Sequence, residues 1–155
     1  MATHEGTRAA GLTQMMTKEL LVALQYTPDD KLDWVPMGAA KTPRAIIVEC
    51  AAGYKWLAAE LRGEQNAAAA WEGTKAEDFP TREALTELIT AGEAEMLAAI
   101  DALTDEQLEE KRQVFWGEET LRDLMWMGVI HTNYHVGQLN YIQTLWGDTE
   151  MHHAM

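Results

Sequence analysis

The chain has 155 residues, of which 47% are hydrophobic, so it can form one domain (residues 1–155) with a substantial core, yet it lacks any run of about 18 apolar residues that could span a membrane. Its 25 acidic residues against 12 basic ones give a formal net charge of −13, which argues against nucleic acid as a partner. The single cysteine cannot form an intramolecular disulfide, and no apolar signal segment opens the sequence, so we expect a cytoplasmic protein.

Four long helices are predicted from the spacing of apolar residues, and the first runs from about Thr7 to Tyr26. The second runs from Thr42 to Arg62, where Thr42 suits the N-cap and Pro43 the first helical position. We expect this helix to fray into the alanine run at 67–70.

The third predicted helix starts at Pro80-Thr81, and a capping box from Thr104 to Gln107 predicts a short helix after it. The segment from Gln113 to Trp116 can form a brief extended piece. The fourth long helix is predicted from Thr120 to Trp146 and is stopped by Gly147. The pattern therefore indicates an all-α bundle, with connections longer than the roughly 2–8 residues usual between bundle helices, which leaves room for crossovers.

His131 and His135 lie four residues apart in the last predicted helix, so both imidazoles belong to one helix face. That face continues at steps of three and four residues, as in a helix packed within a bundle, through Leu121, Leu124, Gly128, Gln138, Ile142 and Leu145. Buried imidazoles need partners, because an unsatisfied buried polar group costs about 1–3 kcal/mol. Histidines at this spacing bind a divalent metal in helical metalloproteases. The alternative is a pair of core histidines bonded to hydroxyls, carbonyls or water.

Glu49 is a polar residue in the apolar stripe of the second helix, between Ile46 and Trp56. Glutamate is almost never fully buried without a partner, and a cation bound by the two histidines would be such a partner. The alternatives are a slightly rotated helix, with the carboxylate at the bundle rim near Lys55, Arg44 or solvent, and a metal-free network in which Glu49 bonds both histidines. The neighbouring Cys50 lies about 100° round the helix and reads as a small packed residue.

Three tryptophans fall in the connections between the predicted long helices: Trp34, Trp71 and Trp116. Large aromatic side chains in such positions either plug the ends of a bundle, which is the commoner role, or line a pocket. Here the second possibility would be a pocket over the metal.

Several of these segments together resemble the DinB/YfiT-like superfamily of metal-dependent enzymes. They are Thr42-Pro-Arg-Ala-Ile-Ile-Val-Glu49, Glu119-Thr-Leu-Arg-Asp-Leu and His131-Thr-Asn-Tyr-His135-Val-Gly-Gln138-Leu, together with Trp34-Val-Pro36 and Leu145-Trp-Gly-Asp148. The resemblance covers nearly the whole chain. It implies an all-α four-helix bundle with long crossover-type connections, in which not all neighbours in sequence run antiparallel, and a homodimer.

The resemblance also implies a metal site, with one departure from the family pattern. Members usually carry a histidine at the position that Glu49 holds here, so the implied ligand set is Glu49, His131 and His135. Family members contain nickel or zinc, and the harder carboxylate ligand makes iron or manganese alternatives. Gln138 and Tyr134 are candidates for hydrogen bonds that orient the metal-binding histidines. Gln138 lies closer to the histidine face of the helix than Tyr134 does.

The function expected from these features is a metal-dependent transferase or hydrolase acting on a small molecule. By the family resemblance, one form of this activity would use a low-molecular-weight thiol. Three protein ligands would leave metal positions for water or substrate. The alternative is a non-enzymatic, dimeric, metal- or ligand-binding stress protein, whose interface would use Trp126 and Tyr141 unless these pack within the chain.

Overall fold

The computed structural model describes residues 3–154. Four long helices form its body, and their bounds are α1 His4–Gln25, α2 Pro43–Arg62, α4 Arg82–Ala102 and α5 Leu121–Leu145. The connections add a short helix, α3 (Ala68–Glu72), a hairpin of β1 (Lys111–Val114) and β2 (Gly117–Thr120), and three 3-10 turns, η1 (Asp29–Lys31), η2 (Ala76–Asp78) and η3 (Gln107–Glu109). The predicted all-α bundle is confirmed.

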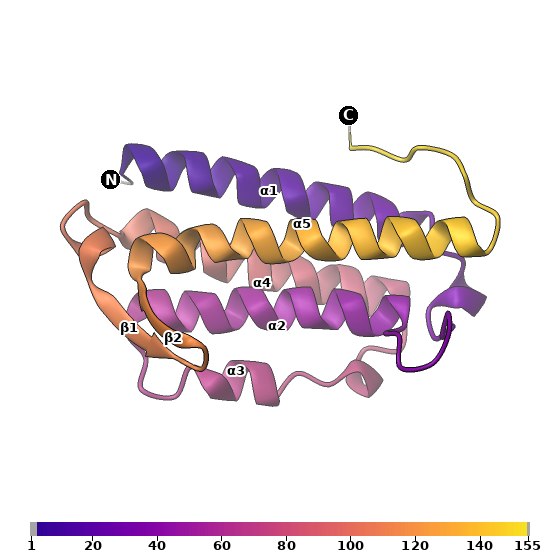
Figure 1. Cartoon of the computed structure of the whole chain (residues 1–155), viewed down its shortest axis with the longest axis horizontal. Helices are drawn as coiled ribbons and strands as arrows, with labels where there is room; N and C mark the ends of the chain where they lie inside the picture. Colours follow the sequence, from indigo (N-terminus) through magenta and orange to yellow (C-terminus); the bar gives the residue numbers. More distant parts are fainter. Residues whose placement is uncertain (1–2, 155) are drawn as a thin grey trace.

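The four long helices pack in a square in which α1 and α2 occupy one diagonal and α4 and α5 the other (Figure 1). The successive long helices α2 and α4 are neighbours and run parallel, as do α1 and α5, whereas α1 with α4 and α2 with α5 run antiparallel (Figure 1). The segment between α2 and α4 must therefore return along the bundle, and α3 and η2 lie on this return. The expected crossover-type connection is confirmed.

Every long helix begins after a threonine whose hydroxyl accepts a hydrogen bond from the first turn. These N-cap residues are Thr3, Thr42, Thr81 and Thr120. At α5 the cap is reciprocal, because the Asp123 carboxylate also accepts from the backbone N–H of Thr120. The predicted starts at Thr42 and Thr120 are correct, but α1 starts at His4 and not at Thr7, since Thr3 is its cap.

Two connections differ from the sequence prediction. Gly63 adopts a left-handed conformation with φ 71° and ends α2, so the alanine run forms the separate helix α3 and does not extend α2. The capping box at Thr104 and Gln107 is present, but it opens only a 3-10 turn. The extended piece predicted at Gln113–Trp116 is in part correct, because Gln113 and Val114 end strand β1, whereas Phe115 and Trp116 form the two-residue turn of the hairpin.

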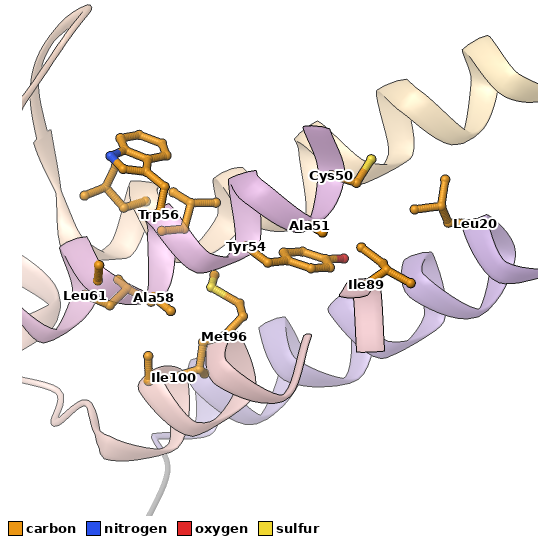
Figure 2. Packing of buried hydrophobic residues seen from close by; sticks show 14 of the residues in the cluster. Leu20, Cys50, Ala51, Tyr54, Trp56, Ala58, Leu61, Ile89, Met96 and Ile100 are labelled. Atoms are coloured by element: carbon orange, nitrogen blue, oxygen red, sulfur yellow. The ribbon is translucent and has the colours of Figure 1, made fainter. Parts of the chain in front are cut away.

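The core lies between the four long helices and is built around the inner face of α2 (Figure 2). Tyr54 is fully buried there, and its hydroxyl lies 3.1 Å from that of Thr17 on α1. Gly92 lets α4 approach closely, because an added Cβ would lie 3.0 Å from the Ala51 carbonyl oxygen. Within residues 3–154, no helix combines the length and apolarity needed to cross a membrane.

Candidate metal centre

The two histidines face α2 in the middle of the bundle. Because α2 and α5 are antiparallel neighbours, His131 lies against Gly53 and His135 lies near Glu49. The Nε2 atoms of the two imidazoles are 3.1 Å apart, and their ring planes are nearly perpendicular. The four-residue spacing of His131 and His135 thus places two ring nitrogens next to each other on one face of α5.

The buried face of α5 is turned slightly from the predicted stripe. Leu145, predicted to face inward, is 48% exposed, whereas Thr132, Val136 and Leu139 are buried. This rotation leaves His135 in the core but moves His131 to a half-buried position at its edge. The histidine pair therefore lies at the border between the core and an accessible cavity.

Glu49 lies at the bundle rim, with its side chain 21% exposed. Its Oε2 forms an ion pair with Lys41, while Oε1 lies 3.8 Å from Nε2 of His135. The partner is neither Lys55 nor Arg44, since Arg44 is held by the Asp33 carboxylate. Glu49 is thus near the histidines without a direct hydrogen bond to either, so the described side chains do not form the metal-free network in which it bonds both.

Cys50 is the residue that the sequence interpretation undervalued. Its Sγ and one ring nitrogen from each of His131 and His135 all lie within 4.8 Å of one another, and the thiol is fully buried. Burial raises the pKa of the thiol, so it is protonated at neutral pH. The signal in the sequence for Cys50 as a metal ligand was its position directly after Glu49. Buried cysteines that only pack are, however, far commoner than cysteines that bind a metal.

Gln138 and Tyr134 form a chain of hydrogen bonds behind His135. The amide of Gln138 donates to the Tyr134 hydroxyl at 2.8 Å, and its oxygen lies 2.7 Å from Nδ1 of His135. With this orientation of the amide, Nδ1–H is the donor, so Nε2 carries the lone pair and can accept a hydrogen bond from Nε2–H of His131, 3.1 Å away. A hydrogen bond to the far nitrogen of an imidazole is the usual way in which a protein orients a histidine that binds a metal.

Both histidines are kept neutral by their surroundings. Burial, followed by the neighbouring His135, lowers the pKa of His131 from 6.5 to about 4, against a partial offset from Glu49. Burial also lowers the pKa of His135, although the hydrogen bond to Gln138 acts in the opposite direction. Neutral imidazoles at pH 7 have lone pairs available, which is the form that binds metals.

The donor atoms fit a divalent metal. Two nitrogens bound to one ion at about 2.0–2.1 Å lie roughly 2.8–3.4 Å apart at octahedral to tetrahedral angles, and the observed separation of 3.1 Å falls in that range. A carboxylate and a thiol are both within reach as a third donor. His131 and His135 would hold the ion, with Glu49 or Cys50 completing the set.

A cavity of about 530 Å³ opens beside the histidine pair. Its walls come from α5, from Ile46 and Glu49 on α2, and from the segment Pro36–Lys41 that precedes α2. The polar groups that reach it include Lys41, Tyr134 and Gln138. Its volume is that of a small-molecule site.

The three loop tryptophans divide between the two predicted roles. Trp34 packs edge-on against Trp146, next to the C-terminal end of α5, as a plug would. Trp71 lies with its ring centre 6.1 Å from that of His131, and Trp116 packs against Trp56. The last two therefore lie beside the candidate metal centre.

Comparison with known proteins agrees with the helical fold. The crystal structure of the DinB-like protein YjoA of Bacillus subtilis superposes with a TM-score of 0.72 over 96% of this chain and 99% of that one, at 16% sequence identity, which is a likeness of fold. A comparison with curated proteins gave no match. The family model described as DinB superfamily matches residues 12–139, from within α1 to the histidine motif of α5. The chain belongs to the DinB superfamily.

Proposed function

We propose that this chain is a metal-dependent enzyme, a transferase or hydrolase of a small molecule, with His131, His135 and Glu49 as the metal ligands. The observation that carries the proposal is the pair of neutral imidazole nitrogens 3.1 Å apart at the edge of an accessible cavity. A structural metal is usually enclosed by four protein ligands, whereas a catalytic metal keeps open positions. Nickel or zinc is proposed first, and iron or manganese second.

A divalent ion at this site would supply an activated water or thiol at neutral pH. The protein's own groups prepare the site for that chemistry. Gln138 orients His135 by accepting from Nδ1–H, and Tyr134 fixes the Gln138 amide. Lys41 balances the Glu49 carboxylate at the cavity wall. The polar wall suits a substrate with hydrogen-bonding groups, such as a low-molecular-weight thiol.

The test is the metal content of protein purified without an affinity tag, measured by plasma mass spectrometry. We would compare wild type with Glu49→Ala, Cys50→Ala and His135→Ala, and use His152→Ala as the control. His152 pairs with Asp148 and belongs to the C-terminal tail. We expect about one metal ion per chain in wild type, Cys50→Ala and His152→Ala, and loss of the metal in the other two variants.

Other outcomes point elsewhere. Loss in Cys50→Ala with retention in Glu49→Ala would make the thiolate the third ligand. A wild type that takes up no nickel, zinc, manganese or iron would overturn the metal-dependent function and leave the histidines as a polar network. If metal binds, failure of the loaded protein to transfer a thiol to electrophiles or to hydrolyse esters and amides would argue against the enzyme.

A second candidate function is a non-enzymatic dimeric binding protein. One face of α5 supports it, because an exposed apolar stripe follows the helix at Ile130, Tyr134, Tyr141 and Leu145. Trp126, by contrast, packs within the chain, and its indole N–H donates to Glu5. Sedimentation velocity should detect a dimer that Ile130→Asp converts to monomer, and a monomeric wild type at micromolar concentration would contradict this candidate.

A further inference from the structure

A second cavity, of about 370 Å³, lies beside His131. Its walls are mainly aromatic and apolar, and the residues that matter here are Gly53, Trp56, Trp71, Phe115, Trp116 and Met127. Glu49 and His131 line both this cavity and the larger one. The two cavities therefore meet at the candidate metal centre.

Three separate elements build the aromatic wall. Trp56 projects from α2, Trp71 comes from α3, and the turn of the β1–β2 hairpin adds Phe115 and Trp116. The ring centre of Trp56 lies 5.5 Å from Trp116, 5.6 Å from Phe115 and 6.5 Å from Trp71, with the two indole contacts edge-on. The hairpin that packs beside α2 (Figure 1) thus serves to bring two rings to this cavity.

The wall offers ring faces and few polar groups. The indole N–H of Trp56 donates to Glu60 at 3.1 Å, and that of Trp116 donates to Glu119 at 2.8 Å. Neither Glu60 nor Glu119 lines the cavity. The indole donors of Trp56 and Trp116 are therefore engaged, and the polar groups left among the lining residues are Glu49, His131 and the indole N–H of Trp71.

The aromatic groups are too exposed to be a simple core plug. Trp56 is buried at 6% exposure, but Trp71 is 37%, Trp116 42% and Phe115 83% exposed. A plug would bury these rings against one another and leave no space between them. Here they surround a cavity whose volume falls in the range of small-molecule sites.

The charges around the cavity select against ions. An anion would find no lysine or arginine among the lining residues and would meet the electron-rich faces of the aromatic rings. An organic cation would find the charge of Glu49 already balanced by Lys41, and a divalent ion held at His131 would repel it. An uncharged group meets neither penalty, and planar rings stack well on indole faces.

We propose that this aromatic cavity is a subsite for a planar, uncharged, aromatic part of a substrate, held next to the metal centre. Its place beside a metal rests on the proposed function, whereas the binding of the aromatic group does not. The arrangement gives the site two compartments, a polar one for one reactant and an aromatic one for the other, which meet at Glu49 and His131.

The test is calorimetric titration of metal-free protein with 2-naphthol, which is uncharged at pH 7. Two comparison ligands separate the requirements, namely 2-naphthoate, which adds a negative charge, and decahydro-2-naphthol, which is not planar. The variants are Phe115→Ala and Trp116→Leu, and Trp34→Phe is the control because Trp34 packs against Trp146, away from the lining residues. Circular dichroism checks that each variant folds.

We expect 2-naphthol to bind at one site per chain, with affinity about tenfold weaker in Trp116→Leu, and also weaker in Phe115→Ala, but unchanged in Trp34→Phe. Both comparison ligands should bind at least tenfold more weakly than 2-naphthol. Equal binding of 2-naphthoate or decahydro-2-naphthol, or equal affinity in all variants, would overturn the subsite. So would no binding at all, even if metal binds to the histidines.

Titration of His135→Ala separates the two proposals. Retained naphthol binding in this variant would support the subsite even where metal binding fails. In manganese-loaded wild type, the naphthol protons should show strong paramagnetic relaxation, because the cavity includes His131. Naphthol that binds but shows no such relaxation in manganese-loaded protein would place the ligand away from the metal and overturn the two-compartment arrangement.

Discussion

A methyl group on Gly53 would meet the imidazole of His131, because an added Cβ lies 2.9 Å from both Cε1 and Nδ1 of that ring. Gly53→Ala must therefore move His131 away from α2 or push the two helices apart. We expect the variant to bind metal about 10–100-fold more weakly, as when a group that orients a ligand is lost. A competition titration with a chromophoric chelator would measure this change.

Gly11→Ala is the matched control, since nothing lies within 4 Å of a Cβ added at that helical position. It should leave metal affinity unchanged and raise stability by about 0.5–1 kcal/mol, as alanine replaces glycine in a helix. Wild-type affinity in Gly53→Ala would mean that the tight contact with α2 does not position His131 for metal binding.

At this scale the sequence predicted which residues come together but not their roles. The histidine spacing was enough to bring two ring nitrogens together, and the misplaced Glu49 lies 3.8 Å from one of them, whereas the group of donors within 4.8 Å of one another includes Cys50 and not Glu49. The position of Cys50 and the ion pair of Glu49 with Lys41 depend on the rotation of α2 and on the path of the preceding loop. Neither quantity follows from periodicity alone.

At the level of elements, α1 depends on α4 for its C-terminal cap. The last turn of α1 has no basic residue, and the guanidinium of Arg82, at the start of α4, donates to the carbonyls of Leu24, Gln25 and Thr27. Arg82→Ala should lower the free energy of unfolding by about 2 kcal/mol, because several charge-assisted hydrogen bonds are lost together.

Urea denaturation would measure the loss, with Lys111→Ala as the control. Lys111 forms an exposed ion pair with Glu118, so its removal should change stability by about 0.5 kcal/mol or less. Equal effects of the two substitutions would show that Arg82 does not cap α1.

The long helices were predictable because each has a threonine cap or an apolar stripe that the chain itself displays. The hairpin was only half predicted, since β2 is Gly-Glu-Glu-Thr and shows no apolar alternation. Its strand form depends on pairing with β1. The short helix α3 was merged with α2 because a run of alanines is compatible with either, and the left-handed conformation of Gly63 decides between them.

For the whole molecule, the parallel packing of α2 with α4 did not follow from the amphipathic pattern. An apolar stripe indicates that one face of a helix is buried in a core, but it does not indicate which other helix packs against that face. The long connections left room for a crossover, and the family resemblance supplied the topology. The place of the aromatic cavity depends on this topology, since α3 lies on the return segment between α2 and α4 (Figure 1).

The histidine pair should make the stability of the metal-free protein depend on pH. The pKa of His131 is lowered from 6.5 in the unfolded chain to about 4 in the fold, so between these values the unfolded state binds a proton that the folded state does not. The contribution to stability is therefore complete above pH 6.5 and is lost as the pH falls toward 4. From pH 7 to pH 5, His131 alone should lower the free energy of unfolding by about 2 kcal/mol. Urea denaturation at pH 7, 6 and 5 should show a shallower pH dependence in His131→Gln than in wild type, whereas parallel curves would contradict the burial of a neutral imidazole at this position.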